Sequence, residues 1–432
     1  MLRLPAIVTK FSILNRRPVY EKVTFWERRS YEPVLLTMPP SRRTYNRKMY
    51  MLVRFFCLLT VLILGFAAPL RAQSLQAIPD SLYSGLEYLL TVPKGNADIA
   101  PEQLSEIIAF VASTAPDTSM TMQDRDKASG GFHAFTLRGD LKRVADYVYN
   151  PDIPVYVTMP SSVREQEWLD PATGQALKLL PQALDKSSTF LVRGAERETI
   201  TPDANTGGYY AYQQDRAVTV FQGPTGPVLV SVSCQEKPSD IGRKGCVVGD
   251  DGNWNYLYSD ETGLTKTGLG WVDSYMYDAH SILIFVSDSK AGVVRVGSFK
   301  WLNAGWAKVN MVKQIHIING IKRFASDFKA VLESPRLPKA QELAAMHRDL
   351  EADSAENLRQ LVAPYLAAIL QSGDSEVSSA PFKKLLASGE YLQKMGQKEM
   401  VKVVLKEFLK QRLGRQSLIQ VAQVGQQVTP QP

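Results

Sequence analysis

The feature that most constrains the fold is a long apolar stripe between residues 306 and 332. Large apolar side chains recur there at steps of three and four residues, the spacing that places them on one face of an α-helix. The stripe consists of Trp306, Val309, Val312, Ile315, Ile318, Ile321, Phe324, Phe328, Val331 and Leu332. Leaving such side chains in water would forgo about 1.5–3 kcal/mol for each of them. The sequence therefore predicts one helix, Trp306–Leu332, that another layer of the protein covers.

The nearest apolar surface in the sequence is the β-rich stretch before this helix. Segments rich in Val, Ile, Tyr, Phe and Trp alternate there with turn residues, a pattern typical of antiparallel strands with short connections. We expect Ile315, Ile318, Ile321 and Phe324 to face the strands that contain Trp271–Tyr277 and Val293–Trp301. The predicted strands are Thr189–Arg193, Tyr209–Phe221, Val228–Cys234, Trp254–Tyr258, Gly270–Tyr277, Ser281–Val286 and Val293–Trp301.

Helical spacing also occurs on either side of this region. Before it, the helices Pro101–Ser113 and Asp140–Tyr149 are predicted around a short strand, Phe132–Leu137. After it, helices are predicted over Lys339–Gln371 and Ala380–Leu413. The predicted fold class is α+β, with an antiparallel β-sheet covered by a long amphipathic helix and followed by a C-terminal helical region.

The beginning of the chain has the order of a secretory signal. Arg47, Lys48 and Arg54 precede an apolar run of about 14 residues, 55–68, and the small residue Ala72 follows. The run is shorter than the roughly 20 residues that span a bilayer, which favours a cleaved signal over a retained anchor. We expect cleavage after Ala72, or after Ala67, and export to the periplasm or the medium, with no membrane span in the mature chain.

These patterns divide the chain into six parts. Because a signal peptide begins at the initiator methionine, the true start is predicted at Met49 or Met51. Residues 1–48 then form a mis-called N-terminal extension and 49–72 the signal peptide. The remaining parts are a mixed α/β N-terminal part (73–186), the sheet with the long helix (187–334), the C-terminal helical region (335–415) and a disordered tail (416–432).

Export changes the meaning of the net charge. The whole chain carries 50 basic and 43 acidic residues, a formal charge of +7. Residues 1–72 hold 13 of the basic and 3 of the acidic residues, so the remainder carries 37 basic and 40 acidic residues, a charge of −3. A mildly acidic protein gives no electrostatic reason to expect a nucleic-acid partner.

Two cysteines, Cys234 and Cys246, remain after the signal peptide. An even pair in an exported protein predicts a disulfide, and closing a loop of this length would stabilise the fold by about 3 kcal/mol. Two free thiols are the alternative. No histidine lies close enough in sequence to complete a tetrahedral metal site with them.

Motifs of known chemistry are missing from the sequence. The four histidines, His133, His280, His316 and His347, are scattered, and none forms an H-E-x-x-H pair. The sequence also lacks G-x-S-x-G, Walker, G-x-G-x-x-G and C-x-x-C patterns. We therefore expect no metal and no cofactor, and the sequence leans against an enzyme.

Aromatic side chains gather between Gly268 and Phe328. They could line a ligand cavity, since such rings combine large contact area with a polar handle. Packing in the core is the more common role of such an aromatic stripe. For His316, the alternative to ligand binding is a position on a solvated, basic side of the helix. The candidate ligand-binding residues are Trp271, Tyr275, Tyr277, Trp306 and His316.

The order of elements resembles the START-like, or helix-grip, architecture. In this sequence the strand Phe132–Leu137, the helix Asp140–Tyr149, the sheet and the helix Trp306–Leu332 carry the likeness. The resemblance implies an apolar cavity between sheet and helix, filled by a lipid or another apolar or amphipathic small molecule. The alternatives are a structural or interaction protein, whose C-terminal helices bind an envelope protein, and an enzyme without a recognisable motif.

Overall fold

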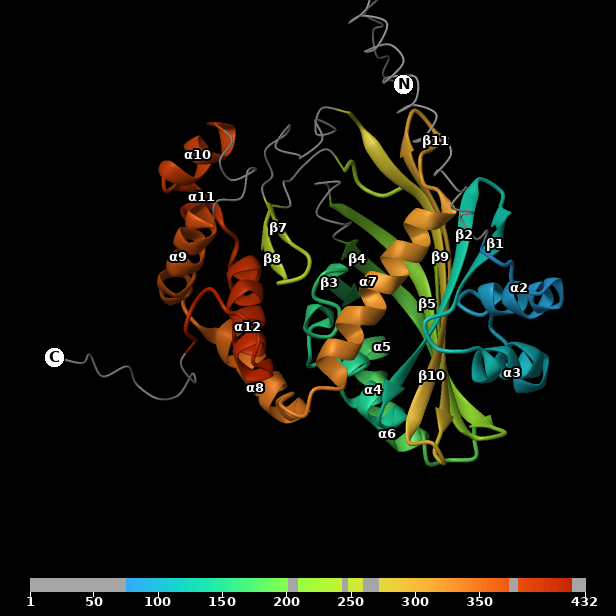
Figure 1. The fold of residues 1–432 in the computed structure, drawn as a ribbon. Coiled ribbons are helices and arrows are strands. Elements are labelled where there is room, and N and C mark those ends of the chain that lie inside the picture. The colour runs from blue at the N-terminus through green and yellow to red at the C-terminus, as the bar shows by residue number, and fades with distance from the viewer. Residues whose placement is uncertain (1–74, 201–208, 243–247, 259–271, 373–379, 422–432) are drawn as a thin grey trace, which may run out of the picture. The chain divides into compact units, whose positions relative to one another are not determined.

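The computed structural model describes residues 75–200, 209–242, 248–258, 272–372 and 380–421. They belong to the second of two compact units of the chain, Gln73–Pro432. This unit combines a large antiparallel sheet with helices, so the predicted α+β class is confirmed. Figure 1 shows the sheet with helices on both of its faces.

The main sheet has nine strands in the order β1-β2-β10-β9-β6-β5-β4-β3, with β11 paired to β10. Every neighbouring pair is antiparallel. A separate two-stranded sheet is formed by β7 and β8. The strands are β1 (Ser119–Arg125), β2 (Ala128–Arg138), β3 (Val163–Trp168), β4 (Phe190–Ile200), β5 (Tyr210–Gly223), β6 (Gly226–Gln235), β7 (Val248–Asp250), β8 (Asn255–Leu257), β9 (Ser274–Asp288), β10 (Val293–Trp306) and β11 (Val309–Asn310).

The sheet includes strands from an earlier part of the chain than the sequence predicted. β1, β2 and β3 precede the predicted sheet region, and β2 pairs with β10 through ten residues, from Arg138–Val293 to Ser129–Leu302. The predicted strands Gly270–Tyr277 and Ser281–Val286 form a single strand, β9. A register shift between Asn303 and Ala304 of β10 accommodates the junction.

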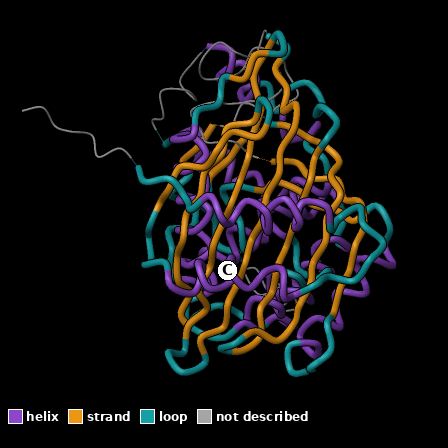
Figure 2. The backbone as a smooth tube through the Cα atoms, turned by 90° about the vertical axis from the view of Figure 1, so that its right-hand side faces the viewer, coloured by secondary structure: helices purple, strands orange, loops and turns teal. Residues whose placement is uncertain are grey.

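One face of the sheet is covered by α2 (Tyr83–Thr91) and α3 (Ser105–Ser113). Their apolar residues share a core with Phe132, Ile282 and Phe299 of the sheet. Gly297 allows α3 to approach closely, because a Cβ there would lie 2.5 Å from a methyl group of Val111. Figure 2, viewed from the side of these helices, shows the strands side by side behind them.

The opposite face is packed against α4 (Leu141–Val148), α5 (Pro171–Ala176), α6 (Leu180–Ala183) and α7 (Gln314–Leu332). The rings of Phe324 and Phe328 in α7 lie 6.0 and 6.4 Å from the ring of Phe135 in β2. Ile318 is fully buried, whereas Ile315 is 47% exposed. The expected inward face of α7 therefore starts one turn later than predicted, and its nearest strand is β2.

Residues 306–313 do not belong to this helix, contrary to the prediction. Ala307 and Lys308 have positive φ values of 50° and 61°, the backbone of a two-residue hairpin turn. Val309 then pairs back with Trp306. Trp306 and Val309 thus share the three-residue spacing of the apolar stripe although they lie in a hairpin.

The C-terminal region consists of shorter helices than predicted. Ser354 caps α9 and separates it from α8, while Gly389 (φ 68°) and Gly396 interrupt the second predicted helix. Residues 400–410 of α12 are buried on every side of the helix. The helices are α8 (Ala340–Ala352), α9 (Ala355–Gln371), α10 (Ala380–Ala387), α11 (Glu390–Lys394) and α12 (Gln397–Leu413). Within the described part of the chain, no helix has the length and apolar character of a membrane span.

The predicted Cys234–Cys246 disulfide is not formed in the structure. Cys234 is a free thiol, only 4% exposed, and it donates to the carbonyl of Leu90 in α2 at 3.5 Å. Its side chain belongs to the core between the sheet and α2. Cys246 lies outside the described residues. Cys234, which the sequence places at the end of a predicted strand, therefore has its side chain in the packed layer between the sheet and α2.

Candidate ligand-binding site

A cleft of about 460 Å³ lies between α7 and the strand β2. Its volume falls within the range of small-molecule sites. Three of its side chains carry basic nitrogens, His133 of β2 and Lys322 and Lys329 of α7. The residues that line it are Asp117, His133, Lys322, Ala325, Ser326 and Lys329.

The helix presents its four lining residues for a simple geometric reason. Positions 325, 326 and 329 follow Lys322 by three, four and seven residues, so the four side chains lie on one face of α7. Lys322 is exposed, and Lys329 is half-buried. The adjacent face of the same helix carries Ile318, Ile321 and Phe328, which are buried in the molecule.

His133 is the buried polar residue of the lining, with 3% of its surface accessible. Its Nδ1 lies 3.0 Å from the Oγ of Ser119 on β1. Burial lowers the pKa of His133, the ammonium groups of Lys322 and Lys329 also lower it, and Asp117 raises it. The imidazole is therefore neutral at pH 7. It becomes easier to protonate when an anion offsets the two lysines.

Lys300 of β10 extends the basic character of this face of the sheet. In the antiparallel register Ser298 lies opposite His133 and Lys300 lies opposite Gly131. Lys300 is thus a diagonal neighbour of His133, a relationship that places side chains about 7–8 Å apart. Among the described residues the side chain of Lys300 has no hydrogen bond or ion pair, and burial lowers the pKa of its amine.

A second polar group on the sheet is already satisfied internally. Glu196 of β4 is fully buried and accepts hydrogen bonds from Gln166, Gln214 and Arg216 at 2.5–2.6 Å. Glu198 accepts from the hydroxyl of Tyr212 at 2.5 Å. Burial raises the pKa of Glu196, and Arg216 opposes this effect. Because these groups pair with one another, the network acts as a structural element of β4 and β5.

A third group of charges joins α12 to the sheet. Arg164 of β3 and Lys402 of α12 both contact Glu399, at 3.0 and 2.8 Å. Lys402 also pairs with Glu165 at 3.1 Å. Burial raises the pKa of Glu399, but Arg164 and Lys402 outweigh it and hold that pKa at about 2. These ion pairs bind the C-terminal helices to the end of the sheet.

Lys406, one turn further along α12, has a different environment. Its Nζ donates to the carbonyl of Pro160 at 3.0 Å and lies 4.8 Å from the centre of the Tyr256 ring. Burial, together with the positive charges of Lys402 and Lys410, lowers the pKa of Lys406 to about 7. The space beside it holds no more than about one water molecule. This volume excludes a substrate, although a lysine with such a pKa is otherwise typical of catalytic sites.

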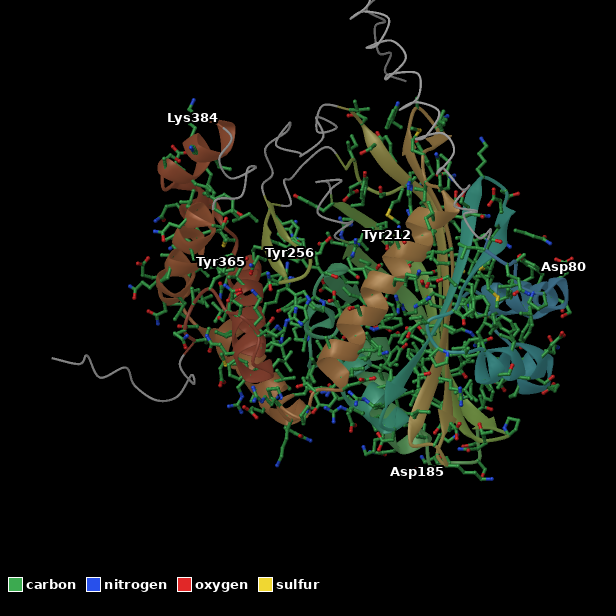
Figure 3. All side chains as sticks on the ribbon, in the orientation of Figure 1. Asp80, Asp185, Tyr212, Tyr256, Tyr365 and Lys384 are labelled. Atoms are coloured by element: carbon green, nitrogen blue, oxygen red, sulfur yellow. The ribbon has the colours of Figure 1, made fainter. Side chains whose placement is uncertain are left out.

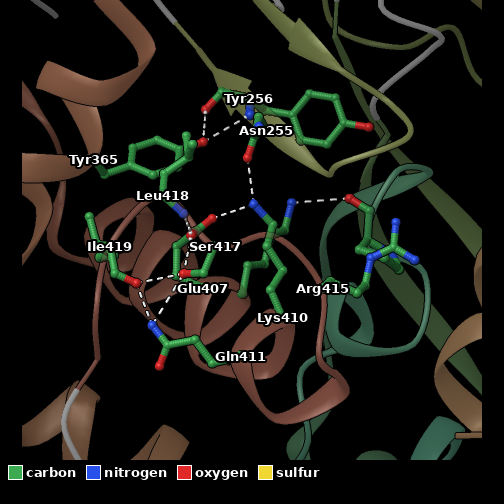
Figure 4. A network of polar contacts seen from close by, with 12 residues as sticks. Asn255, Tyr256, Tyr365, Glu407, Lys410, Gln411, Arg415, Ser417, Leu418 and Ile419 are labelled. Carbon is green, nitrogen blue, oxygen red and sulfur yellow. Dashed lines mark hydrogen bonds and ion pairs between the residues drawn. The ribbon is translucent and has the colours of Figure 1, made fainter. Parts of the chain in front are cut away.

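The end of α12 completes this buried core (Figure 4). Glu407 and Lys410 pair with each other, and Lys410 also donates to Asn255 of β8. Glu407 further accepts from the hydroxyl of Ser417 at 2.7 Å and from the backbone N–H of Leu418 at 2.6 Å. The chain after α12 is thereby held against β8.

Two hydrogen bonds between a pair of tyrosines join α9 to β8 in the same region. The hydroxyl of Tyr365 in α9 accepts from the N–H of Tyr256 at 3.0 Å and donates to its carbonyl at 3.1 Å. Figure 3 shows Tyr256 and Tyr365 on the facing elements β8 and α9. The α12 core therefore reads as a polar, solidly packed junction, and the cleft at α7 is the better candidate for a ligand.

The structure does not gather the predicted ligand-binding residues into one cavity. Tyr275 and Tyr277 stack on each other with ring centres 5.9 Å apart. Trp306 is 36% exposed at the end of β10. His316 is exposed, and its Nδ1 accepts from the N–H of Lys313 at the start of α7. Trp271 lies outside the described residues.

The lining residues of the cleft were not selected from the sequence. His133 was noted only as one of four scattered histidines. Lys322 belongs to the basic side of the predicted helix, which the sequence pattern indicates to be solvated. The usable pattern was the spacing Lys322, Ser326 and Lys329 beside the apolar stripe of the same helix, but only the pairing of β2 with β10 brings His133 under this helix.

The described residues hold no group of three or more His, Cys, Asp or Glu side chains placed to bind a metal ion. No protein-family model matches the chain, and no curated protein is significantly similar to it. The chemistry of the cleft is therefore the basis for assigning a function.

Proposed function

We propose that this protein binds a small ligand with an anionic group, a carboxylate or a phosphate, in the cleft between α7 and β2. The observation that carries the proposal is the convergence of Lys322, Lys329 and His133 on one cleft of about 460 Å³. Ammonium groups and imidazole donate charge-assisted hydrogen bonds to such oxygens. Asp117 is the one acidic residue of the lining, so the cleft carries a net positive charge at neutral pH.

The polar lining modifies the kind of ligand expected from the sequence. Ala325 is the one apolar residue among those that line the cleft, which favours a ligand that is polar at this end over a purely apolar one. We propose further that α7 and the sheet form a helix-grip arrangement around it. The contacts of Phe324 and Phe328 with Phe135 support this part of the proposal.

The test is native mass spectrometry of the protein purified from the cells that produce it, followed by thermal melts with added anions. We expect a co-purified acidic small molecule, or a melting temperature raised by inorganic phosphate or by acetate at matched ionic strength. Whichever anion acts distinguishes a phosphate ligand from a carboxylate ligand. The variant Lys322→Gln/Lys329→Gln should lose the effect, and Lys290→Gln, an exposed lysine in the turn after β9, should keep it.

Equal stabilisation of the wild type and the cleft variant would contradict the proposal, because the anion would then act elsewhere. A lack of any bound molecule and of any anion effect would contradict it as well. Under either outcome the interaction or enzyme hypotheses would deserve preference.

We also propose that the protein is exported. The support is the order of basic residues, apolar run and small residue between Arg47 and Ala72. N-terminal sequencing of protein from the periplasm or the medium should begin at Gln73, or at Ala68 if the second site is used. A mature protein that begins at Met1 would overturn this part.

A further inference from the structure

The large apolar side chains that the described residues expose are concentrated at one end of the sheet. Nine such side chains are exposed, and five of them lie in or next to the start of β9, the end of β10, β11 and the start of α7. We call these five the apolar tip: Val272, Trp306, Val309, Met311 and Ile315, with exposed fractions of 38%, 36%, 55%, 47% and 47%. Such a concentration marks an interaction surface.

Pairing and contact place these side chains next to one another. Trp306 pairs with Val309 across the hairpin turn and with Ser274, two residues after Val272. Met311 follows β11 and donates its N–H to the carbonyl of Ala304 at 2.8 Å. Ile315 lies in the first turn of α7. The end of β10 and the strand β11 lie at the upper end of the sheet in Figure 1.

The charged side chains between Trp306 and Ile315 of the apolar tip are basic, which favours a partner with an anionic surface. The stretch Trp306–His316 contains Lys308 and Lys313 and no acidic residue. Both lysines are exposed between the apolar positions. Acidic residues nearby include Asp273, Asp124 and Asp126; Asp124 accepts from Gln314 at 3.4 Å, and Lys127, next to Asp126, accepts from Asn310 through its carbonyl.

We propose that the apolar tip docks on an anionic lipid surface. Tryptophan favours the interface of a bilayer, where its ring is in an apolar and its N–H in a wet environment. Lysines beside it keep their stems on apolar surface and place their charge among anionic headgroups. A hairpin end with exposed apolar side chains and lysines fits a flat bilayer, whereas a peptide partner would need a groove.

The experiment is co-sedimentation of the protein with vesicles of phosphatidylcholine, with and without phosphatidylglycerol. We expect binding to the anionic vesicles, and at least tenfold weaker binding for Trp306→Ser/Val309→Ser. A second variant, Lys308→Gln/Lys313→Gln, changes surface charge without touching the core and should lose the preference for anionic vesicles. The matched control is Leu169→Ser/Leu179→Ser, which removes two apolar side chains exposed elsewhere, 48% and 55%.

Three results would overturn this inference. The first is a wild-type protein that stays in the supernatant with both kinds of vesicle. The second is equal binding by the tip variant and the control. The third is dimerisation in the absence of vesicles that Trp306→Ser/Val309→Ser abolishes, since a second copy would then be the occupant of the apolar tip.

Discussion

Arg164 of β3 and Glu399 of α12 form an ion pair of 3.0 Å between groups 235 residues apart in the sequence. Both side chains are largely buried, and the guanidinium also lies 4.0 Å from the centre of the Tyr258 ring. Lys402 contacts the same carboxylate. The sheet and the C-terminal helices are thus joined by charges that depend on one another.

Glu399→Gln should reduce the free energy of unfolding by about 3–5 kcal/mol, because it leaves the buried charge of Arg164 without its counterion and Lys402 with Glu165 alone. Urea unfolding at pH 7 measures the loss. Glu390→Gln, which breaks the exposed pair with Lys394, is the matched control and should cost less than about 1 kcal/mol. Equal effects of the two substitutions would mean that the junction does not depend on Glu399.

Lys406→Met should flatten the dependence of stability on pH. The pKa of Lys406 is about 7 in the folded protein against a usual 10.5. Between pH 7 and 10.5 folding therefore requires this amine to lose its proton, a cost that is absent above pH 10.5 and grows as the pH falls towards 7. In that window the wild type should gain up to ~1.4 kcal/mol per pH unit from this group.

Urea unfolding at pH 7.5, 8.5 and 9.5 compares these slopes. The control is Lys398→Met, at a position where the side chain is 78% exposed; its slope should match that of the wild type. If the Lys406→Met slope also matches, the lysine is charged in the folded protein and its environment has been misjudged.

Cys234 should resist alkylation in the native protein. Burial raises the pKa of its thiol to about 12, and the thiolate is the reactive form. Treatment with iodoacetamide followed by peptide mass spectrometry should leave Cys234 unmodified in buffer and modified in urea. Recovery of a peptide in which Cys234 is bridged to Cys246 would contradict the free thiol.

Ile318→Asp should destabilise the fold by about 3–5 kcal/mol. Ile318 is fully buried against Gly131 of β2, so closely that a Cβ at position 131 would lie 3.1 Å from Cγ1 of Ile318, and a carboxylate there would lack a partner. Lys322→Asp on the exposed face should change stability by less than about 0.5 kcal/mol. Thermal melts of the two variants check this, and similar losses would show that the inward face of α7 is assigned incorrectly.

The sequence predicted which segments form strands and helices better than it predicted which of these elements pair or pack with one another. Strand textures identified β4, β5, β6 and β10, and the helical stripe identified α7 from Ile315 onward and its buried face from Ile318 onward. Local patterns could not show that β2 pairs with β10 across more than 150 residues, because pairing depends on long-range register. The hairpin at Ala307–Lys308 was missed because two residues with positive φ that are not glycine leave little trace in the sequence.

The site was harder to predict than the fold for the same reason. The cleft combines Asp117, just before β1, and His133 of β2 with Lys322 and Lys329 of α7, segments that are distant in the sequence. The predicted aromatic residues are close in sequence, but Tyr275 and Tyr277 contact each other while Trp306 is partly exposed at the end of β10. Candidate residues that are close in sequence therefore belong to a partly exposed surface and do not line the cleft.

The central claim is that the cleft between α7 and β2 binds an anionic group. The most direct test is an NMR titration of the imidazole of His133 with inorganic phosphate at constant ionic strength. The account predicts that phosphate shifts the His133 resonances and raises its pKa, so that binding strengthens as the pH falls. Lys322→Gln/Lys329→Gln should weaken binding at least tenfold, about 1.4 kcal/mol. His133 resonances and a His133 pKa that phosphate leaves unchanged, while the fold is intact, would contradict it.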